Sequence, residues 1–142
     1  MTTRIPAIDG WFTTAGEPAL LGTRCDSCGS YFFPPERMLC RNPACGSTDL
    51  AEHELGRRGK VWSFSINHYA APAPYVGKEP FEPYTVVAVE LGAEQMVVLG
   101  QLAEGFDPAT LKIGDEVEVV IEPLFTDDEG NEHIVWKWRP VR

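Results

Sequence analysis

The sequence predicts a mainly β protein in which an N-terminal arm and a four-cysteine ribbon precede a five-stranded OB-fold barrel with one short helix. Two observations carry this prediction: four cysteines stand in two close pairs, and five runs rich in branched and aromatic residues follow Gly59. The predicted boundaries place the arm in residues 1–22, the ribbon in residues 23–55 and the OB-fold domain in residues 56–142.

The cysteine pairs are Cys25 with Cys28 and Cys40 with Cys45, and a glycine follows the second cysteine of each pair. Two such loops direct four thiolates at one centre, which is the closed tetrahedral arrangement typical of structural zinc. Two disulfides or four unrelated buried thiols are the alternatives. Because the N-terminus lacks the apolar core of a signal peptide, we expect a cytoplasmic protein, and a reducing compartment favours metal over disulfides.

The arm holds Trp11, Phe12, Leu20 and Leu21 without a sustained helical period, so we expect an extended segment with at most one helical turn. These apolar side chains have no core of their own. They pack on the ribbon, on the barrel or on a partner chain, and the sequence leaves these three options open.

A short strand is expected to enter the first cysteine pair at residues 23–25. Tyr31 and Phe32 are interpreted as the hydrophobic lid of the metal site, with a docking surface as the alternative. A module of this size has too little core to fold alone, so metal binding supplies much of its folding free energy. Residues 51–59 are predicted to be a polar connector in which His53 faces solvent.

The barrel is expected from the period-two patterning of the second half of the chain. In the first strand, the alternation places Trp62, Phe64 and Ile66 inward. Between the third and fourth strands, Asp107 as N-cap and Pro108 as first helical residue predict one helical turn. The predicted strands cover residues 61–69, 84–91, 95–102, 116–124 and 133–141.

In the last strand, Ile134, Trp136 and Trp138 share one face, because side chains alternate along a strand. Five antiparallel strands with a short helix after the third match the closed Greek-key barrel of the OB type, in which closure hides the sheet edges. An open five-stranded sandwich or an SH3-like barrel is the alternative. In an OB barrel the ligand face lies between two loops, which here are residues 70–83 and 126–132.

Residues 70–83 form a long loop with four prolines, and such loops are usually functional or contact surfaces. Two aromatic faces and the only cation of the loop make Tyr75, Lys78 and Phe81 the candidate cofactor-binding residues. A rigid surface loop that closes one barrel end is the alternative. Residues 126–132 lack the spacing of a calcium loop and are interpreted as a solvated turn.

Lys137 and Arg139 lie on the face of the last strand opposite the tryptophans. We expect them to form cross-strand ion pairs with carboxylates on the preceding strand. An anion site is the alternative, and it requires further cations close by. The carboxylates are Glu116, Glu118 and Glu122, and the further cations are Arg57, Arg58 and Lys60.

The formal net charge of −9 is spread along the chain, which argues against nucleic-acid binding because phosphates are held through lysine and arginine. No apolar run approaches the ~20 residues that span a bilayer. With all four cysteines committed to metal, no thiol remains as a nucleophile, and a closed site has no open position for water. His68 and His133 have no serine or carboxylate at a catalytic spacing. We therefore expect a binding or assembly subunit without catalytic residues of its own.

The ordered motifs resemble the rubredoxin-like zinc-ribbon plus OB-fold family associated with acyl-CoA metabolism, also called domain of unknown function family 35. The resemblance covers almost the whole chain. It rests on residues 21–29, 33–35, 58–63, 89–91, 113–117 and 136–141, together with Cys40 and Cys45.

This resemblance implies an accessory subunit that docks on a thiolase-like enzyme, whose own cysteine and histidine do the chemistry. It implies thiolytic or retro-aldol cleavage, as in the degradation of steroid side chains or aromatic acids, and coenzyme A or acyl-CoA shared with the partner. Many members have a longer helical N-terminal region, which is reduced here to the arm around Trp11 and Phe12. A nucleic-acid-binding OB protein and a rubredoxin-like iron electron carrier are the alternatives.

Overall fold

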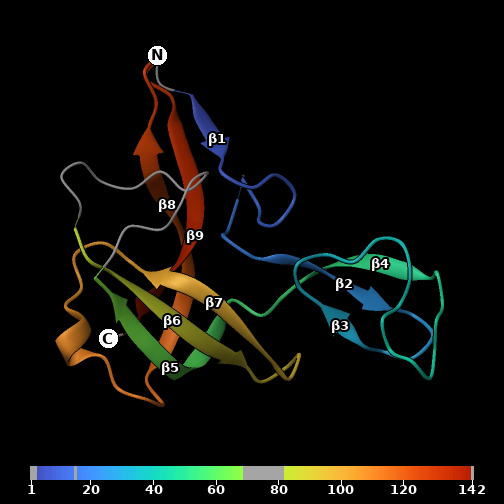
Figure 1. The fold of residues 1–142 in the computed structure, drawn as a ribbon. Helices are drawn as coiled ribbons and strands as arrows, with labels where there is room; N and C mark the ends of the chain where they lie inside the picture. The colour runs from blue at the N-terminus through green and yellow to red at the C-terminus, as the bar shows by residue number, and fades with distance from the viewer. Residues whose placement is uncertain (1–2, 15, 69–81, 142) are drawn as a thin grey trace.

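Two sheets make up the protein. The computed structural model describes residues 3–14, 16–68 and 82–141. A three-stranded sheet lies to one side of a larger sheet that curls into a barrel (Figure 1). In the described part of the chain, no helix is long and apolar enough to cross a membrane.

The smaller sheet carries the cysteine loops. It consists of β2 (Leu21–Cys25), β3 (Tyr31–Phe32) and β4 (Leu50–Glu54), in the order β3-β2-β4. The strand expected at residues 23–25 is therefore present and longer than predicted. The predicted polar connector is wrong, because its first half is β4, which pairs with the whole of β2. Polar side chains on the exposed face of β4 hid this strand, whose stability comes from pairing with β2.

The larger sheet is a closed barrel. The pairings run β5-β6-β7-β9-β8 and return to β5, and β7 with β9 is parallel. This closure confirms the OB-fold prediction over the open alternatives. The strands are β5 (Arg58–Asn67), β6 (Tyr84–Leu91), β7 (Met96–Leu102), β8 (Glu116–Thr126) and β9 (Glu132–Pro140).

The predicted helical turn is present as the 3-10 helix η1 (Pro108–Thr110), and the Asp107 carboxylate accepts a hydrogen bond from the Ala109 N–H. A sixth strand, β1 (Arg4–Pro6), pairs in parallel with the start of β9 and was not expected. Three residues that include a proline give no periodic signal, and proline is tolerated here because this strand lies at an edge.

The arm packs against both neighbouring parts. Its chain turns back through an antiparallel bridge between Phe12 and Leu20. This bridge takes the place of the single helical turn that the sequence permits. The ring centroids of Trp11 and Phe33 are 5.6 Å apart, those of Phe12 and Trp136 are 6.0 Å apart, and those of Phe33 and Trp136 are 5.7 Å apart. The aromatic side chains of the arm therefore join the ribbon to the barrel.

The core is built mainly from the inward face of the barrel. Ile134, Trp136 and Trp138 are all buried, which confirms the predicted inward face of the last strand. The arm and the end of the ribbon sheet add Phe12, Leu20 and Leu55 to the same cluster. Its other members are Val61, Val87, Val89, Leu91, Val98, Leu111, Val117 and Val119.

The predicted inward face of the first barrel strand is partly wrong. The register passes from Val61 opposite Val89 to Ser63 opposite Ala88, so a β-bulge adds one residue at Trp62. A bulge reverses the alternation of side chains. As a result Val61 is buried, whereas Trp62 is 59% exposed.

The residues beyond the bulge keep the inward face in part. Phe64 lies opposite the buried Val87 and is half-buried against the core. Ile66 lies opposite the buried Thr85, but its side chain is 40% exposed near the end of the strand.

Gly59 is a position where two strands touch. A Cβ atom built there would lie 2.5 Å from the Glu90 carbonyl oxygen and 2.6 Å from Cγ1 of Val89. We expect Gly59→Ala to push β5 from β6 and to lower the free energy of unfolding by about 1–3 kcal/mol in urea titrations.

Gly92→Ala is the matched control, since nothing lies within 4 Å of its added Cβ. This variant should change the stability by less than about 0.5 kcal/mol. Equal stability of the two variants would contradict the close approach of β5 and β6.

Candidate metal centre and neighbouring surfaces

Two tight loops present the four cysteines. In the first, the Gly29 N–H donates to the Cys25 carbonyl and the Cys25 N–H donates to the Ser30 carbonyl, both at 2.8 Å. In the second, the Gly46 N–H donates to the Asn42 carbonyl at 3.3 Å. The φ angles of Gly29 and Gly46 are 80° and 68°, which other residues adopt only with strain. Each glycine therefore permits the turn that aims its cysteine pair.

The sulfur atoms converge on one point. All four Sγ atoms lie within 4.8 Å of one another, with Cys25 and Cys45 3.8 Å apart and Cys28 and Cys40 3.6 Å apart. Four sulfurs held about 2.3 Å from a tetrahedral zinc ion are about 3.8 Å apart. A disulfide requires about 2.05 Å, and all four cysteines are free. The residues predicted as ligands are thus brought together in a geometry that fits the ion.

The cysteines have different environments. Cys25 and Cys40 are buried, whereas Cys28 is exposed. Burial raises the pKa of the Cys40 thiol to about 12. Hydrogen bonding to Ser30, whose Oγ lies 3.1 Å from the Cys28 sulfur, lowers the pKa of Cys28 to about 6. The exposed side of the cluster therefore supplies a thiolate at neutral pH, and the buried side releases its proton when a cation binds.

Contacts around the cluster stiffen the ribbon. The hydroxyl of Ser27 donates to that of Ser47 at 2.9 Å and so links the two cysteine loops. The ring centroid of Tyr31 lies 5.0 Å from that of His53, and the Arg24 guanidinium lies 5.8 Å from the Tyr31 centroid. These contacts place Tyr31 between Arg24 and His53, and its role as a lid of the metal site stays a prediction. They also correct the expectation for His53, which lies in β4 and packs on Tyr31.

The candidate cofactor-binding residues Tyr75, Lys78 and Phe81 lie outside the described residues, so their role stays a prediction. The opposite loop, between β8 and β9, is held by Asp127. Its carboxylate accepts hydrogen bonds from the N–H groups of Glu129 and Asn131, both at 2.9 Å. The tip of this turn, at residues 128–130, is exposed, in agreement with the solvated turn that the sequence predicts, and the Asp127 carboxylate holds its backbone.

A carboxylate–histidine pair at this loop was missed by sequence reasoning. His133 Nε2 lies 2.9 Å from Asp127 Oδ2, and the His133 ring stacks on Phe125 with centroids 4.3 Å apart. The hydrogen bond to His133 holds the pKa of Asp127 at about 2. The spacing Asp127-x₅-His133 across a tight hairpin is the only sequence signal for this pair.

The barrel cations form ion pairs, as expected. Lys137 is buried, with its Nζ 3.5 Å from Glu122 and 3.6 Å from Glu104. Arg139 Nε donates to Glu118 at 3.0 Å. Arg58 lies 3.1 Å from Glu116 and 3.7 Å from Glu118. Glutamate carboxylates thus neutralise Lys137, Arg139 and Arg58, which are cations that the alternative anion site requires.

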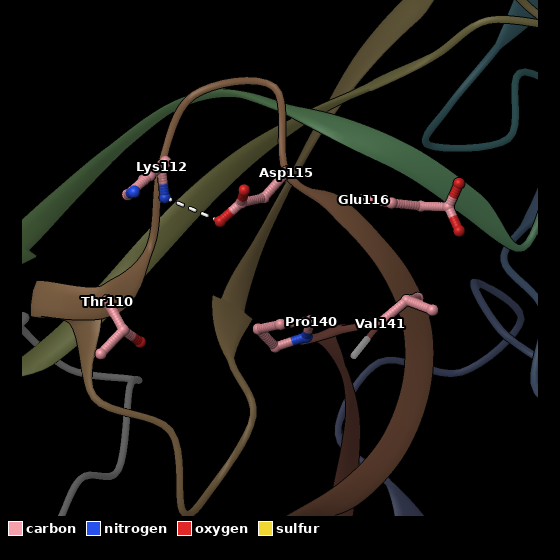
Figure 2. A pocket seen from close by; sticks show the side chains of 6 residues that line it. All are labelled: Thr110, Lys112, Asp115, Glu116, Pro140 and Val141. Carbon is pink, nitrogen blue, oxygen red and sulfur yellow. Dashed lines mark hydrogen bonds between the residues drawn. The ribbon is translucent and has the colours of Figure 1, made fainter.

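A surface hollow beside the barrel end does not suit a nucleotide cofactor. The Lys112 N–H donates to the Asp115 carboxylate at 2.9 Å across it (Figure 2). Its volume of about 240 Å³ is below the roughly 300–1,000 Å³ of small-molecule sites, and two of its lining residues, Asp115 and Glu116, are acidic. It is lined by Thr110, Lys112, Asp115, Glu116, Pro140 and Val141.

A four-cysteine ribbon sheet joined to a closed OB barrel defines the class of zinc-ribbon plus OB-fold proteins. Residues 14–51 match the family model "ChsH2, rubredoxin-like zinc ribbon domain", and residues 52–122 match "ChsH2, C-terminal OB-fold domain". The chain therefore belongs to the ChsH2-type family, whose members include the DUF35 proteins.

Relatives of known role support this assignment. The chain is 33% identical to a DUF35 domain-containing scaffold protein of Methanocaldococcus jannaschii, over 86% of this chain and 82% of the relative. It is 31% identical to the benzoylsuccinyl-CoA thiolase subunit BbsA of Thauera aromatica, over 87% of this chain and 78% of the relative. A solved Ltp2-ChsH2(DUF35) aldolase superposes with a TM-score of 0.64 and 28% identity, over 86% of this chain and 84% of that chain.

Removal of one sulfur tests the metal centre. We expect Cys40→Ser to lose the bound metal and to unfold the ribbon, because three protein ligands do not close the site. Elemental analysis and circular dichroism measure both effects. Ser27→Ala, which alters an exposed neighbour without removing a sulfur, should retain about one metal ion per chain. Retention of a full metal complement by Cys40→Ser would contradict the four-sulfur site.

The Asp127 carboxylate should stabilise the fold in a defined pH window. Its pKa is lowered from 3.8 to about 2, so the stabilisation is present above pH 3.8 and is lost as the pH falls through about 2. We expect Asp127→Asn to lower the thermal midpoint at pH 7, with the difference from wild type fading at acid pH. Asp128→Asn is the control and should show no comparable difference at any pH.

Proposed function

We propose that this chain is a non-catalytic accessory subunit of a thiolase-like enzyme complex in acyl-CoA metabolism. The observation that carries the proposal is the convergence of all four cysteines on one closed site, which leaves no thiol for acyl transfer. Catalytic residues then belong to the partner. The scaffold and thiolase-subunit roles of the relatives support the same conclusion.

The proposed metal is structural zinc, held by Cys25, Cys28, Cys40 and Cys45. Support comes from the sulfur separations and from the match to a zinc-ribbon family model. Zinc in this position braces the ribbon sheet and supplies no chemistry of its own. Iron in the same four sulfurs would give a red protein, so absorption and elemental analysis separate the two metals.

The proposed reaction of the complex is thiolytic or retro-aldol cleavage of an acyl-CoA, as in the degradation of steroid side chains or aromatic acids. The relatives support this class, since one is a benzoylsuccinyl-CoA thiolase subunit and another belongs to an aldolase complex. Coenzyme A or the acyl-CoA would contact this chain through Tyr75, Lys78 and Phe81. The complex would work in the cytoplasm.

Nucleic-acid binding is the weaker function for this barrel. The net charge is −9, and the barrel cations Lys137, Arg139 and Arg58 are each paired with a glutamate. A strand of phosphates would have to compete with these carboxylates. Single-stranded DNA binding with a steep salt dependence would restore this function.

Co-expression with a thiolase-fold enzyme from the same genome tests the proposal. We expect the two chains to co-elute in size-exclusion chromatography and the cleavage activity of the enzyme to fall when this chain is omitted. Separate elution together with full activity of the enzyme alone would overturn the accessory role.

A further inference from the structure

The outer face of β5, β6 and β7 carries an apolar patch that the barrel core does not use. Trp62 is 59% exposed, Leu99 is 59% exposed and Val97 is 42% exposed. These three residues and Ala88, which lies between them, are called the sheet patch below. The three strands lie side by side in the barrel, away from the cysteine loops (Figure 1).

The register shows that the sheet patch is continuous. Ser63, next to Trp62, lies opposite Ala88, and Ala88 lies opposite Leu99. Ala88 points outward, because its neighbours Val87 and Val89 point into the core. Even so, Ala88 is only 7% exposed. Because the bulge sets both Trp62 and Ser63 against Ala88, and Leu99 lies opposite Ala88 on the other side, Trp62, Ala88 and Leu99 follow one another across the three strands.

A specific backbone feature, the β-bulge in β5, shapes the sheet patch. The bulge between Val61 and Ser63 puts Trp62 out of step with Phe64, so Trp62 lies on the outer face while Val61 and Phe64 both lie opposite core residues. A tryptophan exposed in this way loses the hydrophobic stabilisation that burial would give. Clustered exposed apolar residues mark interaction sites, and tryptophan is among the commonest residues that dominate binding energy.

Charge decides which occupant fits. No charged residue belongs to the sheet patch, but Glu90 lies directly opposite both Val97 of the patch and Lys60, so this pair of charges forms one edge of the patch. Two copies of this chain meeting face to face would bring together two net charges of −9. A different protein with an apolar centre and a basic rim avoids this repulsion and gains attraction.

The edge of β7 favours contact with the flat face over addition of a partner strand. The carbonyl of Leu99 accepts a hydrogen bond from Trp136 Nε1 at 3.0 Å. Strand addition along β7 would need this carbonyl, which the indole already occupies. The partner therefore meets side chains of the sheet patch rather than the backbone of its edge.

We propose that the sheet patch is the surface through which this chain docks on its thiolase-like enzyme, on a region that is apolar at its centre and basic at its rim. The proposal rests on the accessory role argued above and names the contact surface for it. Trp62 and Leu99 are the central anchors of the interface.

The test uses this chain and the thiolase-fold enzyme from the same genome with which it co-elutes, with affinity measured by calorimetry. We expect Trp62→Ala and Leu99→Ser each to weaken binding by about 30-fold. Wild-type binding should also weaken between about 50 and about 300 mM salt, because the attraction is screened. Met38→Ala, which removes an 81% exposed side chain from the ribbon, is the control and should bind like wild type.

The outcomes separate the two proposals. Folding of each variant is checked by zinc content and thermal midpoint, which should match wild type because both anchors are exposed. If wild type binds and the Trp62 and Leu99 variants bind equally well, only the docking surface is overturned. If wild type does not bind, the accessory role falls as well. If the variants instead abolish dimerisation of this chain alone, a second copy is the occupant and the docking proposal is overturned.

Discussion

The contact of Trp136 with the arm and the ribbon is the interaction on which the arrangement of this protein depends. Three rings from two parts of the chain, Trp11 and Phe12 of the arm and Phe33 of the ribbon, lie with their centroids within 6.0 Å of its own. Its indole N–H is fixed by the Leu99 carbonyl of β7. The ribbon has too little apolar surface to form a core of its own. It therefore packs on the core of the barrel through this tryptophan.

The small size of the ribbon also explains why the cysteines serve a structural ion while other surfaces remain for contacts. The four sulfurs hold the loops of a sheet whose strands have five residues or fewer, and a structural ion is the usual solution for so small a module. A closed set of four sulfurs engages every cysteine of the sequence, so no free thiol remains. The surfaces available to other molecules are therefore the apolar side chains on the outer face of β5, β6 and β7 and the ion pairs around β8 and β9.

Much of the fold could be predicted from the sequence because its signals are local. The cysteine pairs with their following glycines, the inward tryptophans of β9 and the Asp107 cap each depend on a few neighbouring residues. The candidate site was predictable to the same extent: the four cysteines converge as their spacing indicates. The pair of Asp127 and His133 was not, since Asp127 is typical of a turn, His133 lies in β9, and only the hairpin brings them together.

By itself, the sequence determined the fold class, the ligand set and the acidic character of the chain. The tertiary structure alone decided which face Trp62 occupies, because one extra residue at the bulge reverses the alternation without any change in composition. It also decided that the polar residues 50–54 form a strand and that Lys137 is buried between glutamates. In each case the residues that decide the outcome lie on a neighbouring strand. Backbone pairing and ion pairing between two strands produce no periodic pattern in the sequence of either strand.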